Sequence, residues 1–109
     1  MEPFIPLVTK NCVKRIFLDD IIYIMKKQRK IRIITQTEAY EYYEKLEHIE
    51  GMLDKRFYAC LQHFVINMDY VERMENQTVY FQNGDCLPMG RDNYIKTRQY
   101  YSAYLKKLL

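Results

Sequence analysis

Tryptophan is absent from this chain of 109 residues, and glycine and proline occur only three times each. That scarcity excludes collagen-like repeats and linker-like sequence. Long apolar runs are also absent: Ile21–Met25 and Phe64–Met68 have five residues each, whereas a membrane helix needs about 20. The N-terminal residues include an acid and two prolines, where a secretory signal has a basic and then an apolar segment. We therefore expect a single domain over residues 1–109 that is cytoplasmic and has no membrane partner.

Cysteine is scarce as well, and its placement excludes several kinds of site. Cys12, Cys60 and Cys86 are an odd number spread along the chain without a Cys-x-x-Cys pair, which indicates reduced thiols. His63-x-x-x-Asn67 resembles part of a nuclease motif, and Cys60-x-x-His63 resembles half of a zinc site. Two histidines and three scattered cysteines supply too few groups for a nucleophile with its base, or for four zinc ligands. We expect no enzyme activity, no metal and no cofactor.

The aromatic residues that are present, 11 tyrosines and five phenylalanines, favour β-strands. The tyrosines are expected to be core or half-core residues. Alternating and short apolar segments predict strands over residues 13–18, 21–25, 30–35, 39–43, 57–60, 64–68, 78–82 and 86–89. The polar segment 26–30 has the length of a hairpin connection, and Asn83-Gly84 is the strongest hairpin signal in the chain.

Helical spacing occurs at two places. Apolar residues at Leu46, Ile49, Met52 and Leu53 predict a short internal helix. A C-terminal helix is predicted over residues 94–109, with Asp92 or Asn93 as its N-cap. Its expected apolar stripe consists of Tyr94, Ile95, Arg98, Tyr101, Leu105 and Leu108. The predicted fold is therefore mostly β, in small antiparallel sheets, with one internal and one C-terminal helix.

The net charge of +3 hides an uneven distribution along the chain. Residues 1–35 contain eight basic and three acidic residues, a balance of +5. Residues 36–75 contain four and nine, a balance of −5, and residues 76–109 contain five and two, a balance of +3. If the basic thirds share one face and the acidic third faces away, the molecule suits a polyanion.

The segment from Lys26 to Arg32 concentrates this charge, because five of its seven residues are cationic. Lysine and arginine there can neutralise phosphates, and Arg29 and Gln28 can reach base edges in a major groove. Two interpretations stay open at this point: a DNA-binding loop, or a solvated hairpin whose lysines protect a sheet edge.

Several segments follow one another in the order and spacing of a known family. Asp20–Ile24 is similar to a D-I-I-Y-I-E strand, and Leu46–Leu53 is similar to the family's short helix. Phe57–Asn67 aligns with the signature F-x-R-x-H-R-S-x-I-V-N. Val79–Gly84 and Leu87–Arg91 resemble an N-G hairpin and its L-P-V-S-R exit. The chain thus resembles the LytTR-type DNA-binding domains of bacterial transcription regulators, across nearly its whole length.

This resemblance implies a fold of about ten short strands, with loops that enter successive major grooves and bend double-stranded DNA at paired direct repeats in promoters. It also implies a homodimer on DNA and control by a receiver domain or another regulatory protein. Either the chain is the output portion of a response regulator or it is a regulator without phospho-control. Met1 does not distinguish the two.

The resemblance also implies which residues contact DNA. They are the hairpin loop, the residue after the signature histidine position and the arginine after the last strand. In this sequence these places are the loop around Gln28, Arg29 and Lys30, then Gln62, and then Arg91. From their charge we add Lys26 and Lys27 of the same segment, and we add His63 as a contact to phosphate, which completes the expected DNA-binding set. Arg91 suits guanine, and its alternative is an ion pair with Asp92 or a nearby glutamate.

Departures from the signature affect base preference. Its Arg, His, Arg and Ser positions hold Ala59, Leu61, Gln62 and His63, and Gly90 replaces the serine before Arg91. The family's base preference therefore does not transfer to this chain. The alternative function is a protein-interaction or self-association module without DNA binding.

Overall fold

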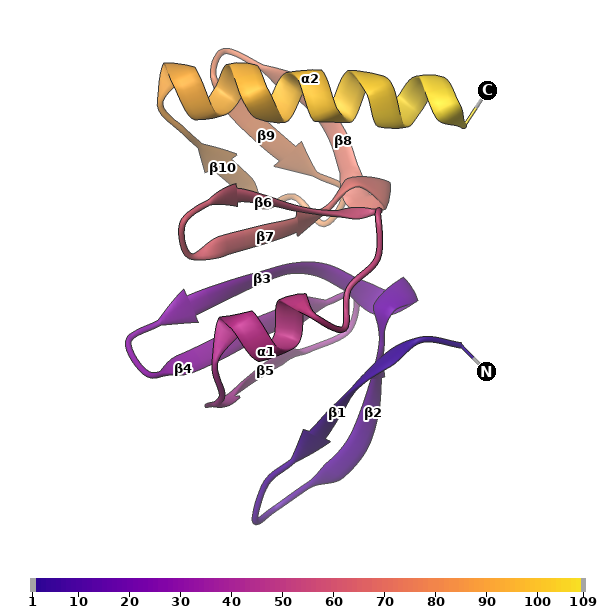
Figure 1. Ribbon diagram of the computed structural model, residues 1–109, viewed down its shortest axis with the longest axis vertical. Helices are drawn as coiled ribbons and strands as arrows, with labels where there is room; N and C mark the ends of the chain where they lie inside the picture. The colour runs from indigo at the N-terminus through magenta and orange to yellow at the C-terminus, as the bar shows by residue number, and fades with distance from the viewer. Residues whose placement is uncertain (1, 109) are drawn as a thin grey trace.

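Antiparallel pairing organises this protein into three sheets, as Figure 1 shows. The computed structural model describes residues 2–108. Within that range the strands are β1 (Phe4–Val8), β2 (Val13–Phe17), β3 (Ile21–Lys27), β4 (Lys30–Thr35), β5 (Ala39–Tyr43), β6 (Phe57–Leu61), β7 (Phe64–Asn67), β8 (Val71–Glu75), β9 (Thr78–Phe81) and β10 (Cys86–Pro88). The helices are η1 (Leu18–Asp20), α1 (Leu46–Glu50), η2 (Met68–Tyr70) and α2 (Arg91–Lys107). The mostly β prediction with one internal and one C-terminal helix is confirmed.

The sheets follow one another along the longest axis of the molecule. The β1–β2 hairpin lies at one end, and the five-stranded sheet with order β5-β4-β3-β7-β6 lies in the middle. The sheet β10-β9-β8 and helix α2 lie at the other end. There α2 packs against β6, the edge strand of the middle sheet. No helix within residues 2–108 is long and apolar enough to cross a membrane.

Two hydrophobic clusters form the core, one on each side of the five-stranded sheet. Consecutive residues of a strand point to opposite faces, which divides Ile21 and Ile22 between the clusters, and a bulge where the register shifts between Ile21 and Tyr23 leaves Tyr23 on the same side as Ile22. Ile21 therefore joins the cluster with β1, β2 and α1, whereas Ile22 joins the cluster with β8–β10 and α2. The tyrosines are mostly half-buried around these clusters, as predicted, and Tyr43 is the exception at 73% exposed.

The hairpin turns are tight. The predicted connection over residues 26–30 is shorter than expected, because β3 and β4 continue until Lys27 pairs with Lys30 and only Gln28 and Arg29 form the turn. Gln28 has φ 58, in the left-handed region that two-residue hairpin turns require. The Asn83-Gly84 hairpin is confirmed between β9 and β10, and Gly84 has φ 94 there.

Helix α2 differs from its prediction in its start and in its buried face. Gly90, not Asp92 or Asn93, is the N-cap, and its carbonyl accepts a hydrogen bond from the amide of Tyr94 at 2.9 Å. Leu109, the predicted last residue, lies outside the described residues.

The predicted stripe of α2 is only partly right: Tyr94 and Tyr101 pack against the core, whereas Ile95, Leu105 and Leu108 are exposed. The packed side also carries Thr97, Tyr100 and Tyr104. Tyrosine is favoured there because its ring fills the core edge while its hydroxyl finds a partner. The Tyr101 hydroxyl, for example, donates to the carbonyl of Val71 at 2.7 Å.

Candidate nucleic-acid interface

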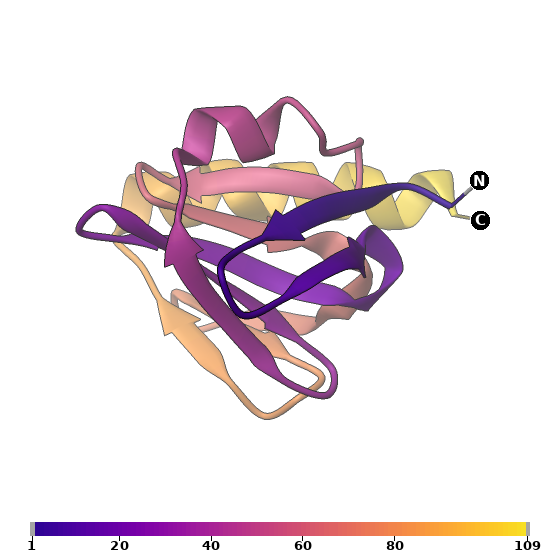
Figure 2. The same cartoon turned by 90° about the horizontal axis from the view of Figure 1, so that it is seen from below.

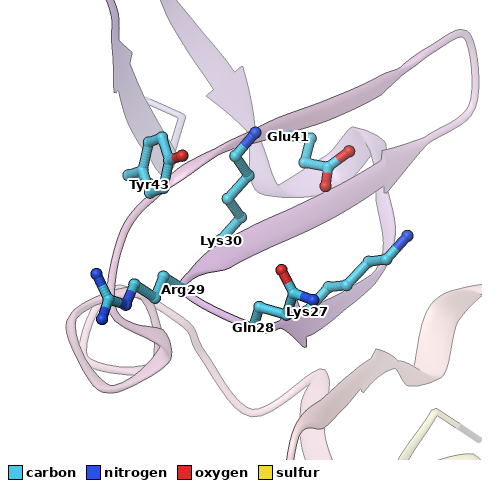
Figure 3. Close-up of a pocket in the computed structure, with 6 residues that line it drawn as sticks. All are labelled: Lys27, Gln28, Arg29, Lys30, Glu41 and Tyr43. Atoms are coloured by element: carbon cyan, nitrogen blue, oxygen red, sulfur yellow. The ribbon is translucent and has the colours of Figure 1, made fainter.

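The tip of the β3–β4 hairpin presents the basic loop expected from the sequence. Lys26, Lys27, Gln28 and Arg29 are exposed, and Lys30 is half-buried. We call these five residues the basic tip. The ammonium of Lys30 lies 4.9 Å from the centre of the Tyr43 ring, a cation–π contact that holds it beside β5. Figure 3 shows Lys30 between Tyr43 and Glu41, while Lys27 and Arg29 extend in opposite directions from the turn.

The β6–β7 turn lies directly beside the basic tip. Gln62 and His63 form this two-residue turn, and both side chains are exposed. Because β3 pairs with β7, the end of β3 meets the start of β7, with Met25 opposite Phe64. The amide of Lys26 donates a hydrogen bond to the carbonyl of His63 at 2.9 Å. This bond joins two predicted segments that are about 35 residues apart in the sequence into one surface.

Arg91 is the first residue of α2 and is exposed. The segment before it is anchored, because the amide of the buried Met89 donates to the carbonyl of Gln77 at 3.0 Å. Among the ion pairs within residues 2–108, none involves Arg91, so the alternative of a pairing with Asp92 or a nearby glutamate is not observed. Its guanidinium remains available for a ligand.

These three segments lie on one side of the molecule. In Figure 1 the β3–β4 tip, the β6–β7 turn and the start of α2 lie one above another along the left edge. Figure 2, turned by 90°, again places all three at the same side. The principal-axis extents of the protein are 41 × 32 × 25 Å, and the segments follow the longest of these. The fold therefore collects the predicted residues into a row.

The acidic third does not face away from this row, contrary to the expectation from charge. Antiparallel pairing of β4 with β5 places Tyr43 opposite Lys30, so the chain returns to the basic tip before α1 begins. Glu41 lines a hollow of about 600 Å³ with Lys27, Gln28, Arg29, Lys30 and Tyr43. Glu44 and Glu47 line a second hollow, of about 410 Å³, against Lys26 and Arg29. Sequence blocks of charge did not predict this, because topology mixes them.

Other polar contacts brace the scaffold. The hydroxyl of Tyr23 on β3 donates to Asp85 in the β9–β10 connection at 2.8 Å. Burial, together with this hydrogen bond and the carboxylate charge, raises the pKa of Tyr23 to about 12. The phenol therefore stays protonated at neutral pH and keeps donating to Asp85. This contact ties the middle sheet to the hairpin that precedes Arg91.

The residues that resembled parts of catalytic or metal motifs, Cys60, His63 and Asn67, lie on the β6–β7 hairpin. Cys60 is buried, and desolvation raises the pKa of its thiol to about 12, so the reactive thiolate is disfavoured. His63 is exposed in its turn. Across residues 2–108, no group of three or more His, Cys, Asp or Glu side chains is arranged to hold a metal ion.

This mostly β domain has a row of exposed cationic and amide side chains. Such a row is a feature of proteins that bind a polyanion. Comparison with known proteins identifies the family. The family model described as "LytTr DNA-binding domain" matches residues 11–102, and the chain belongs to this family. The family is defined by DNA binding, not by a catalytic activity.

Individual relatives agree with this assignment. Accessory gene regulator protein A from two strains of Staphylococcus epidermidis is 32% identical over 71 residues, which cover 62% of this chain and 29% of the relative. The chain thus spans less than a third of the length of those relatives. A solved LytTr DNA-binding domain from Bacillus cereus has 17% sequence identity and a TM-score of 0.74. The match covers 92% of this chain and 97% of that chain, and it supports the fold.

Proposed function

We propose that this protein binds double-stranded DNA in a sequence-specific manner and regulates transcription. The support is the row formed by the basic tip, the β6–β7 turn and Arg91, together with membership of the LytTr family. Lys26, Lys27 and Arg29 would neutralise phosphates, which supplies most of the affinity and makes it salt-dependent. His63 would add a phosphate contact.

Base reading is assigned to the amide and guanidinium groups of the row. Gln28 and Gln62 can pair with the N6 and N7 atoms of adenine, and Arg91 can pair with O6 and N7 of guanine. The observation that carries the proposal is the hydrogen bond between the Lys26 amide and the His63 carbonyl. It fixes phosphate-neutralising and base-reading groups in one rigid surface, so that recognition costs little ordering.

We propose that the loops of the row enter successive major grooves, as in the family that the chain resembles. The row follows the longest axis of the molecule, from the basic tip through the β6–β7 turn to the start of α2. Its segments would then track along one face of the duplex. Bending of the DNA toward the row would increase the contact and add shape readout. We propose that two copies bind paired direct repeats side by side, under the control of a receiver domain or another regulatory protein.

The first experiment is a selection of bound sequences from a random duplex pool, followed by mobility-shift titrations. We expect one enriched sequence, with affinity for it falling steeply between about 50 and 200 mM salt. A scrambled duplex should bind more weakly at every salt concentration. No enrichment and no salt-dependent binding would refute the proposal and favour the protein-interaction alternative.

Arg91→Ala tests the base contact. We expect a loss of about 1–3 kcal/mol in binding free energy and relaxed preference at one position of the enriched sequence. Arg98→Ala is the matched control, because Arg98 is an exposed arginine on the same helix, about 10 Å further along its axis. Unchanged selectivity of Arg91→Ala would remove Arg91 from the interface.

A further inference from the structure

Two carboxylates of the α1 region lie against the basic tip without neutralising it. Glu44 and Glu47 line the hollow of about 410 Å³ together with Lys45 and His48 of the same segment and with Lys26, Gln28 and Arg29 of the basic tip. Within residues 2–108, no ion pair joins a cation of the basic tip to either glutamate. The α1 side of the hollow therefore carries two carboxylates against the one ammonium of Lys45, and its charge is negative where His48 is neutral.

The carboxylate of Glu44 is fixed in this position. Its Oε1 atom accepts a hydrogen bond from the backbone amide of Lys45 at 2.7 Å. The same oxygen lies 3.1 Å from Nδ1 of His48, one turn further along α1. Both partners of Glu44 belong to its own segment, and Glu44 forms no ion pair with Arg29 among the described residues. Its negative charge on this side of the hollow repels a phosphate.

Glu47 stands on the same wall and is exposed. Its side chain makes no hydrogen bond among those of the described residues, so its charge is not shared with a protein partner. A DNA backbone that approaches the basic tip from the α1 side therefore meets two carboxylates and one ammonium, that of the exposed Lys45, so carboxylates outnumber cations on this side. An approach of the outer end of the tip meets Lys27 and Arg29 first.

We propose that Glu44 and Glu47 are specificity-determining residues that keep DNA phosphates off the α1 flank of the basic tip. Non-specific binding depends on phosphate contacts, and the basic tip would make most of them if its α1 side lay along the DNA backbone. Repulsion by the two glutamates destabilises that arrangement. It has less effect when the end of the tip enters a groove. Discrimination between duplexes is thereby increased by weakening the wrong complex. This inference rests on the proposed DNA-binding function.

The test is the double variant Glu44→Gln/Glu47→Gln, which removes both charges and retains similar shapes and hydrogen-bonding oxygens. Glu50→Gln is the matched control, because Glu50 is an exposed glutamate of the same helix that lines neither hollow. Affinities are measured for the selected duplex and its scrambled version, at several salt concentrations.

For the double variant we expect scrambled-duplex affinity to rise on the order of two- to fivefold at low salt, since two repulsions within a Debye length are removed. For the scrambled duplex, the slope of log affinity against log salt concentration should steepen by about 0.9 for one additional phosphate contact. Affinity for the selected duplex should change less, so the ratio of the two affinities falls. Glu50→Gln should leave the ratio unchanged.

Each other outcome is decisive. A double variant whose ratio and slope match those of Glu50→Gln would overturn the inference, as would weaker binding to the selected duplex, which would indicate a direct contact with cytosine. If the wild-type protein selects no sequence, the proposed function itself has failed. If the double variant does not fold, Glu47→Gln alone repeats the test, because its side chain has no hydrogen bond to lose, and about half the effect is expected.

Discussion

Gln28 offers a substitution whose effects on stability and on DNA binding should have opposite signs. Its φ of 58 places a residue with a Cβ atom in the left-handed region, at a cost of roughly 1–2 kcal/mol. Glycine adopts this region freely but loses about 0.5–1 kcal/mol more conformational entropy on folding. Gln28→Gly should therefore stabilise the protein by about 0.5–1 kcal/mol, which raises Tm by roughly 2–8 °C.

The same substitution removes an amide from the proposed interface. The bidentate contact proposed between Gln28 and adenine contributes about 1–3 kcal/mol, so we expect affinity for the selected duplex to fall by about 5- to 150-fold. Thermal unfolding and mobility-shift titration of the same preparation measure both effects. Gln77→Gly is the matched control, because Gln77 has φ 55 in the β8–β9 turn and its contact with the segment before Arg91 uses the backbone carbonyl, which glycine retains.

The control should gain similar stability without losing affinity. A lower Tm for Gln28→Gly would refute the argument from backbone strain. Equal duplex affinities of the two glycine variants would show that the Gln28 amide contributes nothing to recognition.

Three further substitutions test the scaffold. Tyr42→Phe removes a buried hydroxyl that has no hydrogen-bond partner within residues 2–108, so the free energy of unfolding in urea should rise by about 1 kcal/mol. A fall in that free energy would indicate a partner for the hydroxyl. Phe81 is 2% exposed in the cluster beneath α2, so Phe81→Ala should leave a cavity and lower the free energy of unfolding by about 3–5 kcal/mol. A loss below about 1 kcal/mol would contradict its core position. Hydrogen bonds from Arg56 hold the pKa of Asp54 below its ordinary 3.8, so its contribution to stability is present above that pH and is lost as the pH falls through the lower folded value. Asp54→Asn should lower the free energy of unfolding at pH 7 and approach the wild type near pH 2, and a constant difference across that range would refute the assignment.

Local patterns predicted most strands because alternation directly encodes which face is buried. Ile31 and Ile33 on β4 are fully buried, as their alternation with Lys30 and Arg32 indicates. β1 was not predicted as a strand of its own, because Pro6 interrupts its pattern. Proline is tolerated there because β1 belongs to a two-stranded sheet and Pro6 is exposed.

β8 was missed for a different reason. Its sequence from Val71 to Glu75 is mostly charged, and only Val71 is buried. The turn that follows uses Asn76 and Gln77 at φ 53 and 55, without the glycine that makes hairpins recognisable. Pairing with β9 in the third sheet decides its conformation, and that information lies in the partner strand.

The C-terminal helix shows how side-chain chemistry can override apolar counting. Ile95 and Leu105 are more hydrophobic than tyrosine, and both are 43% exposed. The packed side uses tyrosines because the neighbouring strands offer both apolar surface and backbone carbonyls, as the Tyr100 ring stacked on Tyr58 illustrates. Its ring centre lies 4.4 Å from that of Tyr58, while its hydroxyl donates to the carbonyl of Lys55. A stripe of leucines could not satisfy those carbonyls.

The sequence named the segments that the structure brings to one side of the molecule, but it did not predict the charges that surround them. In an antiparallel meander, a strand that leaves a hairpin must be followed by one that returns to it, so β5 ends where β4 began. Any charge placed shortly after Tyr43 is therefore brought back to the basic tip, however far apart the charge blocks look in sequence. Glu44 and Glu47 occupy those positions. Charge balance per third of the chain is thus the wrong quantity for this topology. The informative quantity is the charge at positions that the strand order returns to the basic tip, and the carboxylates of Glu44 and Glu47 at those positions are the basis of our proposal that the α1 side of the tip disfavours one approach of DNA.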